Sequence, residues 1–184
     1  MNSTTVETET IQGAEQHKKT ATSRRAASLA QRIEEGAAGL AAFAESLSEA
    51  EWRTTIVESG GNGRTVGITV HHVATVYPIE VQLAQAIAGG NAVTEVTWEA
   101  VAQMNGKHAQ ENAEISKSAA LELLLRNSQD AAAAVRSFTD DELDQAAPFS
   151  LSFGAPVTAQ FVIEDHALRH SWHHLARIRK TLGR

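Results

Sequence analysis

Four of the eight histidines in the chain, His166, His170, His173 and His174, fall within one short stretch near its C-terminal end. In a helix, residues four apart lie one turn apart on the same face, so the imidazoles of His170 and His174 can point at a single ion. His166 shares that face, but about 12 Å of helix axis separate it from His174, which is too far for both to bind one ion. The spacing leaves two pairs open, His166 with His170 or His170 with His174.

A third imidazole comes from an earlier segment. From about Thr65 to Gly89, apolar residues recur in steps of three and four, and His72 falls on their stripe, whereas His71 is rotated by about 100°. Three neutral imidazoles from two facing helices would suit a divalent metal, zinc or nickel first and iron or manganese as alternatives, with positions left for water or substrate. The competing interpretation is a set of hydrogen-bonded core and surface histidines that bind no metal.

Such a site needs two long helices that face each other. The apolar residues follow the helical period over four segments, residues 23–47, 65–89, 118–138 and 156–182. Pro156 suits the first turn of the last helix, and Pro78 should kink the second helix or break its hydrogen bonding near Ala74.

The connections between these helices carry signals of their own. Capping-box patterns after Ser48 and Thr139 predict short helical turns, and residues 98–112 predict a short crossing helix. The glycine-rich run at residues 59–65 predicts a loop. The sequence therefore predicts an all-α fold, a four-helix bundle with short helical turns in its connections.

Length and composition predict one domain. The 184 residues are 42% hydrophobic and only 5% aromatic, which favours closely packed helices. Residues 1–22 are polar and predict a mobile leader before a bundle domain of residues 23–184. The N-terminus lacks a secretory signal, and no run approaches about 18 apolar residues, so we expect a cytoplasmic protein with no membrane partner.

Charge and cysteine content limit the chemistry. The formal net charge is −6 and the chain has no long basic run, which predicts no nucleic-acid partner. The chain contains no cysteine, so any thiol chemistry has to use an external thiol.

Two histidine motifs resemble those of a known family. His71-His72-Val-Ala and His170-Ser-Trp-His173-His174-Leu-Ala-Arg-Ile178 are similar to motifs of the DinB-like superfamily, which includes thiol-dependent S-transferases and mycothiol-dependent maleylpyruvate isomerases. The resemblance covers about residues 25–182, although the His-Arg-Gly-Gln ending of many members is absent. It implies a DinB-like four-helix bundle that often forms homodimers. It also implies His72, His170 and His174 as metal ligands, and on this ground alone His174 is preferred to His166.

The resemblance further implies an activity. We expect a metal-dependent enzyme that activates a low-molecular-weight thiol, mycothiol- or bacillithiol-like, for transfer to a small-molecule electrophilic substrate. A metal-dependent hydrolase remains an alternative, but it needs a general base, and spacing places neither Glu80 nor Glu164 there. A non-catalytic bundle that binds a metal or ligand is the other alternative. His108, Asn105 and His173 are expected at the surface or the entrance of the site.

Overall fold

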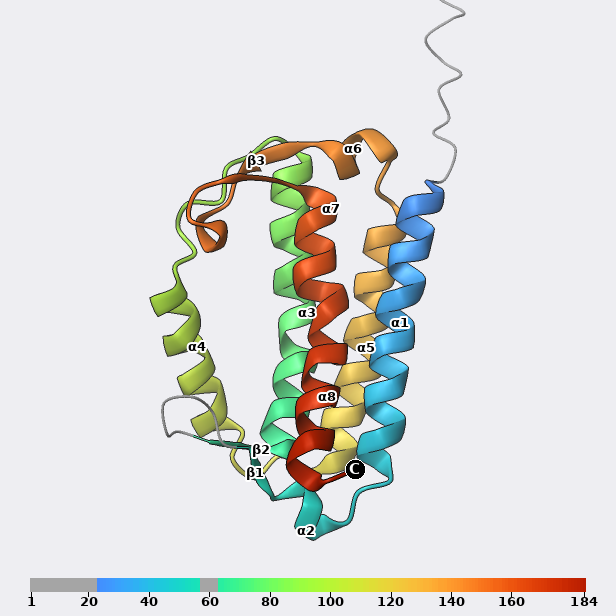
Figure 1. The fold of residues 1–184 in the computed structure, drawn as a ribbon, viewed down its shortest axis with the longest axis vertical. Helices are drawn as coiled ribbons and strands as arrows, with labels where there is room; N and C mark the ends of the chain where they lie inside the picture. The colour runs from blue at the N-terminus through green and yellow to red at the C-terminus, as the bar shows by residue number, and fades with distance from the viewer. Residues whose placement is uncertain (1–22, 57–62) are drawn as a thin grey trace, which may run out of the picture.

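Four long helices run side by side along the longest axis of the molecule (Figure 1). The computed structural model describes residues 23–56 and 63–184, so the expected leader at residues 1–22 and most of the glycine-rich run lie outside the described part. The first three long helices are α1 (Arg24–Glu45), α3 (Val66–Ala88) and α5 (Lys117–Arg136). The fourth runs without a break through α7 (Ala159–Val162), a π-helical segment (Ile163–Leu168) and α8 (Arg169–Leu182). The predicted all-α four-helix bundle is confirmed.

Two short helices begin at the predicted capping boxes. At α2 (Glu49–Trp52) the Ser48 side chain accepts from the backbone N–H of Glu51, and the Glu51 carboxylate accepts from the backbone N–H of Ser48. The same reciprocal pair, Thr139 with Glu142, starts α6 (Asp140–Asp144). These local hydrogen bonds fix where the chain turns at the ends of the bundle.

Two small antiparallel pairs of strands were not predicted. β1 (Thr55–Ile56) pairs with β2 (Arg64–Thr65), and β3 (Ala146–Pro148) pairs with β4 (Pro156–Thr158), with a 3₁₀ turn (Ser150–Ser152) between the latter two. The prediction that Pro156 starts the last helix was wrong, because Pro156 lies opposite Pro148 in this ladder. Proline cannot donate to a ladder, but a two-stranded pair tolerates it. The helix begins at Ala159, after Thr158 caps it by accepting from Phe161 N–H at 3.1 Å.

The core of the bundle lies where α5 packs against both α1 and α3. Pro78 lies inside α3 and cannot donate to the carbonyl of Ala74 four residues earlier. The side-chain amide of Asn127, on α5, donates to that carbonyl at 2.9 Å instead. The hydrogen bond that Pro78 removes is thus replaced from the neighbouring helix, and α3 continues to Ala88.

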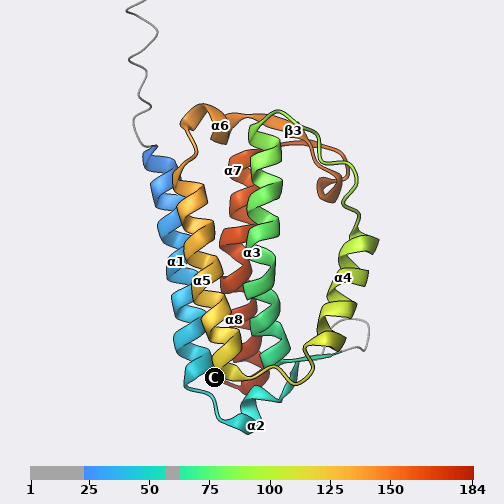
Figure 2. The same cartoon turned by 180° about the vertical axis from the view of Figure 1, so that it is seen from behind.

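The helix α4 (Trp98–Glu111) stands apart from the bundle, as both views show (Figures 1 and 2). None of its residues is buried. Its preceding segment is held by hydrogen bonds from Val93 N–H to the Pro148 carbonyl and from the Ser150 hydroxyl to the Val96 carbonyl. A cavity lies between α4 and α3 and is lined by side chains of both helices. In the described part of the chain, no helix is both long and apolar enough to cross a membrane.

Candidate metal centre

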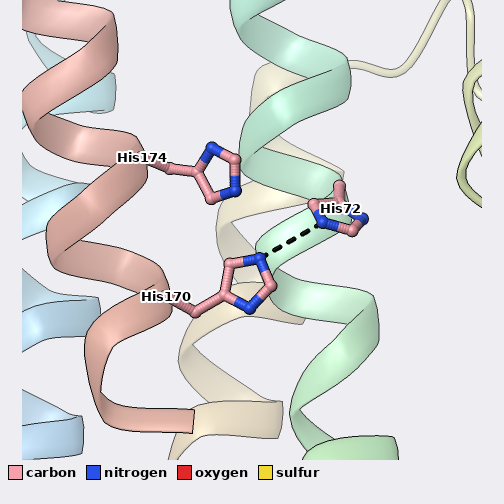
Figure 3. Close-up of side chains that lie close together, drawn as sticks. All are labelled: His72, His170 and His174. Atoms are coloured by element: carbon pink, nitrogen blue, oxygen red, sulfur yellow. Dashed lines mark hydrogen bonds between the residues drawn. The ribbon is translucent and has the colours of Figure 1, made fainter. Parts of the chain in front are cut away.

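Three histidine side chains meet between α3 and α8. His72 projects from α3, and His170 and His174 project from successive turns of α8 toward it (Figure 3). One ring nitrogen from each residue lies within 4.8 Å of the other two. His170 Nε2 and His72 Nε2 are 3.2 Å apart. A tetrahedral ion with bonds of about 2.0–2.1 Å separates its ligand atoms by roughly 3.3 Å, so these two nitrogens match such a site.

The π-helical segment directly precedes α8, which carries His170 and His174. A π-helical turn holds more residues than an α-helical turn, so it shifts the register of the residues on either side. His166 lies inside this segment and packs edge-on against the ring of Phe149, with ring centroids 5.6 Å apart. The cluster accordingly contains His174 and not His166, which is the pairing that the family resemblance favoured.

The buried carboxylate of Glu80 contacts the Nδ1 side of the His170 ring. Glu80 is only 5% exposed, and its Oε1 lies 2.5 Å from His170 Nδ1. Because a carboxylate accepts, Nδ1 is the ring nitrogen that donates to Glu80, and Nε2 is the ring nitrogen that faces His72. A carboxylate that orients a histidine in this way is common around metal-binding histidines. Glu80 therefore orients His170 with Nε2 toward the cluster.

Burial favours the neutral form of the imidazoles of His72 and His174. Desolvation, aided by the nearby His170, lowers the pKa of His72 to about 2. The same two causes, in the same order, lower the pKa of His174. Deprotonated imidazole is the form that binds metal ions, so the cluster offers metal-binding nitrogens at neutral pH.

A cavity of about 520 Å³ opens beside the cluster. All three clustered histidines line it, together with Glu80 and His166. Its other wall is formed largely by apolar side chains of α3 and α4, including Val76 and Val101. This volume suits a small molecule and places it next to the three imidazoles.

The other histidines named from the sequence lie around this centre. His173 is exposed and lines the cavity, in agreement with a place at its entrance. His108 on α4 is half-buried, and its Nε2 lies 2.8 Å from His71 Nδ1. Asn105 lines the same cavity as His173. The pair of His71 and His108 connects α4 to α3 beside the cluster and does not belong to it.

Sequence reasoning considered Glu80 without placing it at the site, and it missed Arg64. Glu80 lies two helical turns after His72, a spacing that places both on one side of α3, but its partner His170 is 90 residues away. Arg64, in β2, lines the cavity as well, and its positive charge contributes to the lowered pKa of His72 and of His174. Only the folded arrangement brings Arg64 to the site.

Comparison with known proteins decides the family. The family model of the DinB superfamily matches residues 32–178, which include all three clustered histidines. The chain belongs to the DinB superfamily. No curated protein matches this DinB superfamily chain.

Two solved structures share the fold of this DinB superfamily member. YfiT from Bacillus subtilis, described as a probable metal-dependent hydrolase with an unusual four-helix bundle topology, has a TM-score of 0.67 at 20% identity, over 89% of each chain. The colibactin self-resistance protein ClbS, solved in complex with a dsDNA, has a TM-score of 0.66 at 17% identity, over 85% of this chain and 94% of ClbS. Family and fold agree on a helical bundle, and the histidine cluster is a group that could hold a metal ion.

The ClbS complex corrects one expectation from the sequence. The net charge of −6 predicts no nucleic-acid partner, and this prediction is wrong because a protein of this fold was solved in complex with a dsDNA. A net charge is a sum over the whole surface and does not describe the charge of one face. Arg64, Arg169 and Arg177, for example, lie around a single cavity of this acidic chain.

Proposed function

We propose that this DinB superfamily member is a metal-dependent thiol S-transferase, with its site in a domain of residues 23–184. One divalent ion would be held by His72, His170 and His174. Zinc or nickel is the preferred ion, and iron or manganese is the alternative. The enzyme would activate a low-molecular-weight thiol of the mycothiol or bacillithiol kind and transfer it to a small electrophile.

The observation that carries this proposal is the convergence of three imidazoles beside a cavity. Their nitrogens lie within 4.8 Å of one another, and two of the three residues are 5% exposed. Among the described residues, these three histidines are the group whose ligand atoms lie close enough together to hold one metal ion. His170 Nε2 and His72 Nε2 lie 3.2 Å apart, a separation that two ligands of one tetrahedral ion would also have.

The donor set fits a borderline metal ion. Three imidazoles without a thiolate suit zinc, nickel or iron better than calcium or magnesium, which prefer oxygen ligands. A divalent ion in such a set supplies a Lewis acid that lowers the pKa of a bound thiol or water. Glu80 contributes by holding the Nδ1 proton of His170, which keeps Nε2 directed at the cluster.

The composition determines where a sulfur nucleophile would come from. The chain contains no cysteine, so a nucleophilic sulfur has to come from a ligand. The cavity of about 520 Å³ extends from the three histidines to α4, so one ligand can reach the cluster while another part of the cavity remains open. The chain's own task would be to bind both reactants and to orient them.

A metal-dependent hydrolase is the second candidate. It is favoured by the fold of YfiT, which is described as a probable metal-dependent hydrolase, and by the position of Glu80. Glu80 is the carboxylate beside the cluster, but its Oε1 binds His170 and its Oε2 is enclosed. To act as the general base of a hydrolase, Glu80 would have to break its hydrogen bond with His170. The transferase needs no such movement of Glu80.

One experiment separates the two candidates. The chain, purified without a metal-affinity step and analysed for metals, is assayed with mycothiol, bacillithiol or glutathione and a reactive electrophile such as chlorodinitrobenzene. The proposal predicts about one divalent ion per chain and thiol consumption that His170→Ala abolishes. Metal-dependent ester hydrolysis without thiol consumption would favour the hydrolase. Metal retention with neither activity would leave a non-catalytic metal-binding bundle, and metal content unchanged in His170→Ala would contradict the site.

A further inference from the structure

We propose that the cavity beside the histidine cluster binds the uncharged, apolar body of a small molecule between α3 and α4. This inference rests on the proposed function and names the class of its electrophilic substrate, a molecule whose larger part is hydrocarbon or aromatic. It is carried by the apolar side chains that both helices present to the cavity and by the exposure of these side chains in the folded chain.

Exposed apolar side chains gather at this cavity. Seven large hydrophobic residues are exposed in the described part of the chain, and three of them, Ile79, Trp98 and Met104, line the cavity. Their exposed fractions are 37%, 55% and 40%. Single exposed apolar residues are ordinary, but a group of them around one concave site marks a binding surface.

The exposed residues belong to two apolar stripes on the walls of the cavity. On α4, Trp98, Val101 and Met104 recur every three residues and line it together. On α3 the lining residues are also three or four apart: Val76, Ile79 and Leu83. Two packed helices would bury such stripes in each other, yet no residue of α4 is buried. A bound apolar body would remove this surface from water, which is favourable.

A third apolar wall comes from the turn between β3 and β4. Leu151 in this turn and Val96 before α4 both line the cavity. The backbone N–H of Ser150 donates to the Val93 carbonyl at 2.8 Å, and the Ser150 hydroxyl donates to the Val96 carbonyl. These hydrogen bonds hold the segment that leads into α4, so the apolar part of the cavity is formed before a ligand binds.

The charged side chains of the lining balance one another. The lining has three arginines and three carboxylates: Arg64, Arg169, Arg177, Glu80, Glu95 and Asp165. Arg169 and Asp165 pair with each other at 3.2 Å, and Glu80 is bound to His170. The two stripes themselves contain no charged residue. The lining therefore defines its ligand by an apolar body and not by a charge.

The size of the cavity and its position indicate a small reactant. Its volume of about 520 Å³ falls within the range of roughly 300–1,000 Å³ that small-molecule sites have. The same lining contains His72, His170 and His174, so a molecule held between the stripes lies beside the proposed metal site. Mycothiol and bacillithiol are polar sugar derivatives. The apolar stripes therefore suit the other reactant, the electrophile.

A neutral fluorescent probe tests this class. N-phenyl-1-naphthylamine carries no charge and fluoresces more strongly in apolar surroundings, and it should bind the metal-loaded full chain. Straight-chain alcohols from 1-hexanol to 1-octanol should displace it. Each added methylene should tighten the competing alcohol about fourfold, because each one removes further apolar surface from water.

Matched variants show whether the probe occupies this cavity. Ile79→Gln on α3 and Met104→Gln on α4 should each weaken the probe about tenfold, because each removes apolar contact from one wall. Leu125 on α5 is 42% exposed and does not line the cavity, so Leu125→Gln should leave the affinity unchanged. Val101→Thr, which preserves the shape of the side chain, should weaken the probe about threefold and replaces any glutamine variant that lowers the melting temperature.

Three results would overturn the inference. The first is the absence of probe binding, and the second is an alcohol affinity that does not rise with chain length. The third is an equal effect of Met104→Gln and Leu125→Gln. Probe affinity that falls as a dimer forms with rising protein concentration would assign the stripes to a second copy of the chain, and this would also overturn the inference.

Metal content and thiol consumption in the same samples keep the two proposals distinct. A chain that retains one ion and consumes thiol but does not bind the probe would overturn the substrate class and leave the proposed function standing. A chain that binds the probe with the methylene dependence but retains no metal would contradict the proposed function and support the assignment of the cavity.

Discussion

The two faces of α3 differ in how completely they are filled. One face presents Val70, Val73 and Tyr77 to the core, where each is fully buried, and the Tyr77 hydroxyl hydrogen bonds to Ser171 Oγ at 2.7 Å. The other face presents His72 and Ile79 to the cavity under α4. The core face buries its apolar groups and pairs its polar ones, and this stabilises the bundle.

Polar atoms near the cavity side remain without partners. Within the described residues, Glu80 Oε2 and His174 Nδ1 are buried and have no hydrogen-bond partner. Unpaired buried polar atoms cost free energy, and native proteins keep few of them. The two faces of α3 therefore have different roles. Substitutions on the core face should change the free energy of unfolding, and substitutions on the cavity face should change ligand affinity.

The largest expected effect is on the core side. Leu124 of α5 is fully buried in the core cluster, and Leu124→Ala should lower the free energy of unfolding by about 2–5 kcal/mol, measured by urea denaturation. Metal affinity, measured by titration of the folded protein, should be unchanged. Weakened metal binding in the folded variant would show that the core and the cavity are coupled. It would contradict the separate roles of the two faces of α3.

A smaller loss of stability is expected where α5 supports Pro78. Asn127→Ala removes the amide that donates to the Ala74 carbonyl, and leaving that carbonyl without a partner should cost about 1–3 kcal/mol in unfolding free energy. Gln103→Ala, on the exposed side of α4, is the control and should change stability little. Equal stabilities of the two variants would mean that water satisfies Ala74 as well as Asn127 does.

The Glu80 side chain tests the cavity side. Glu80→Gln keeps an oxygen that accepts from His170 Nδ1 but removes the negative charge, so metal affinity should fall about 10–100-fold, by competition with a chelating dye. Glu80→Leu should fall further because it also removes the acceptor. Glu164→Gln, in the π-helical segment outside the cavity, is the matched control and should bind metal like the parent chain. Parent affinity in both Glu80 variants would show that Glu80 serves the fold alone.

Much of the bundle could be predicted because its signals are local. Apolar residues three and four apart define the long helices, and Ser48 with Glu51 defines a capping box within four residues. Pro156 was placed in a helix because it suits a first turn, whereas its partner in the ladder, Pro148, is set by tertiary structure. Phe161 and Trp172 of the last helix are apolar and yet 43% and 46% exposed. A π-helical segment between them changes the register that a regular helical period assumes.

The site could be predicted only in part. The spacing of His170 and His174 gave one pair, and the stripe of α3 gave His72, but spacing alone could not choose between His166 and His174. The role of Glu80 depends on a contact across 90 residues, which no local pattern records. The cavity depends on α4 standing away from α3, which again is a property of the tertiary structure.

The most direct test of the metal site compares two histidines of one helix. His174 belongs to the cluster and His166 lines the same cavity outside it, so the two alanine variants remove an imidazole from one helix with and without loss of a proposed ligand. Elemental analysis of the parent chain and both variants, each loaded with zinc and desalted, should give about one ion per chain for the parent and for His166→Ala. The same measurement should give nearly none for His174→Ala. Retention of the ion in His174→Ala, or its loss in His166→Ala, would contradict the proposed site.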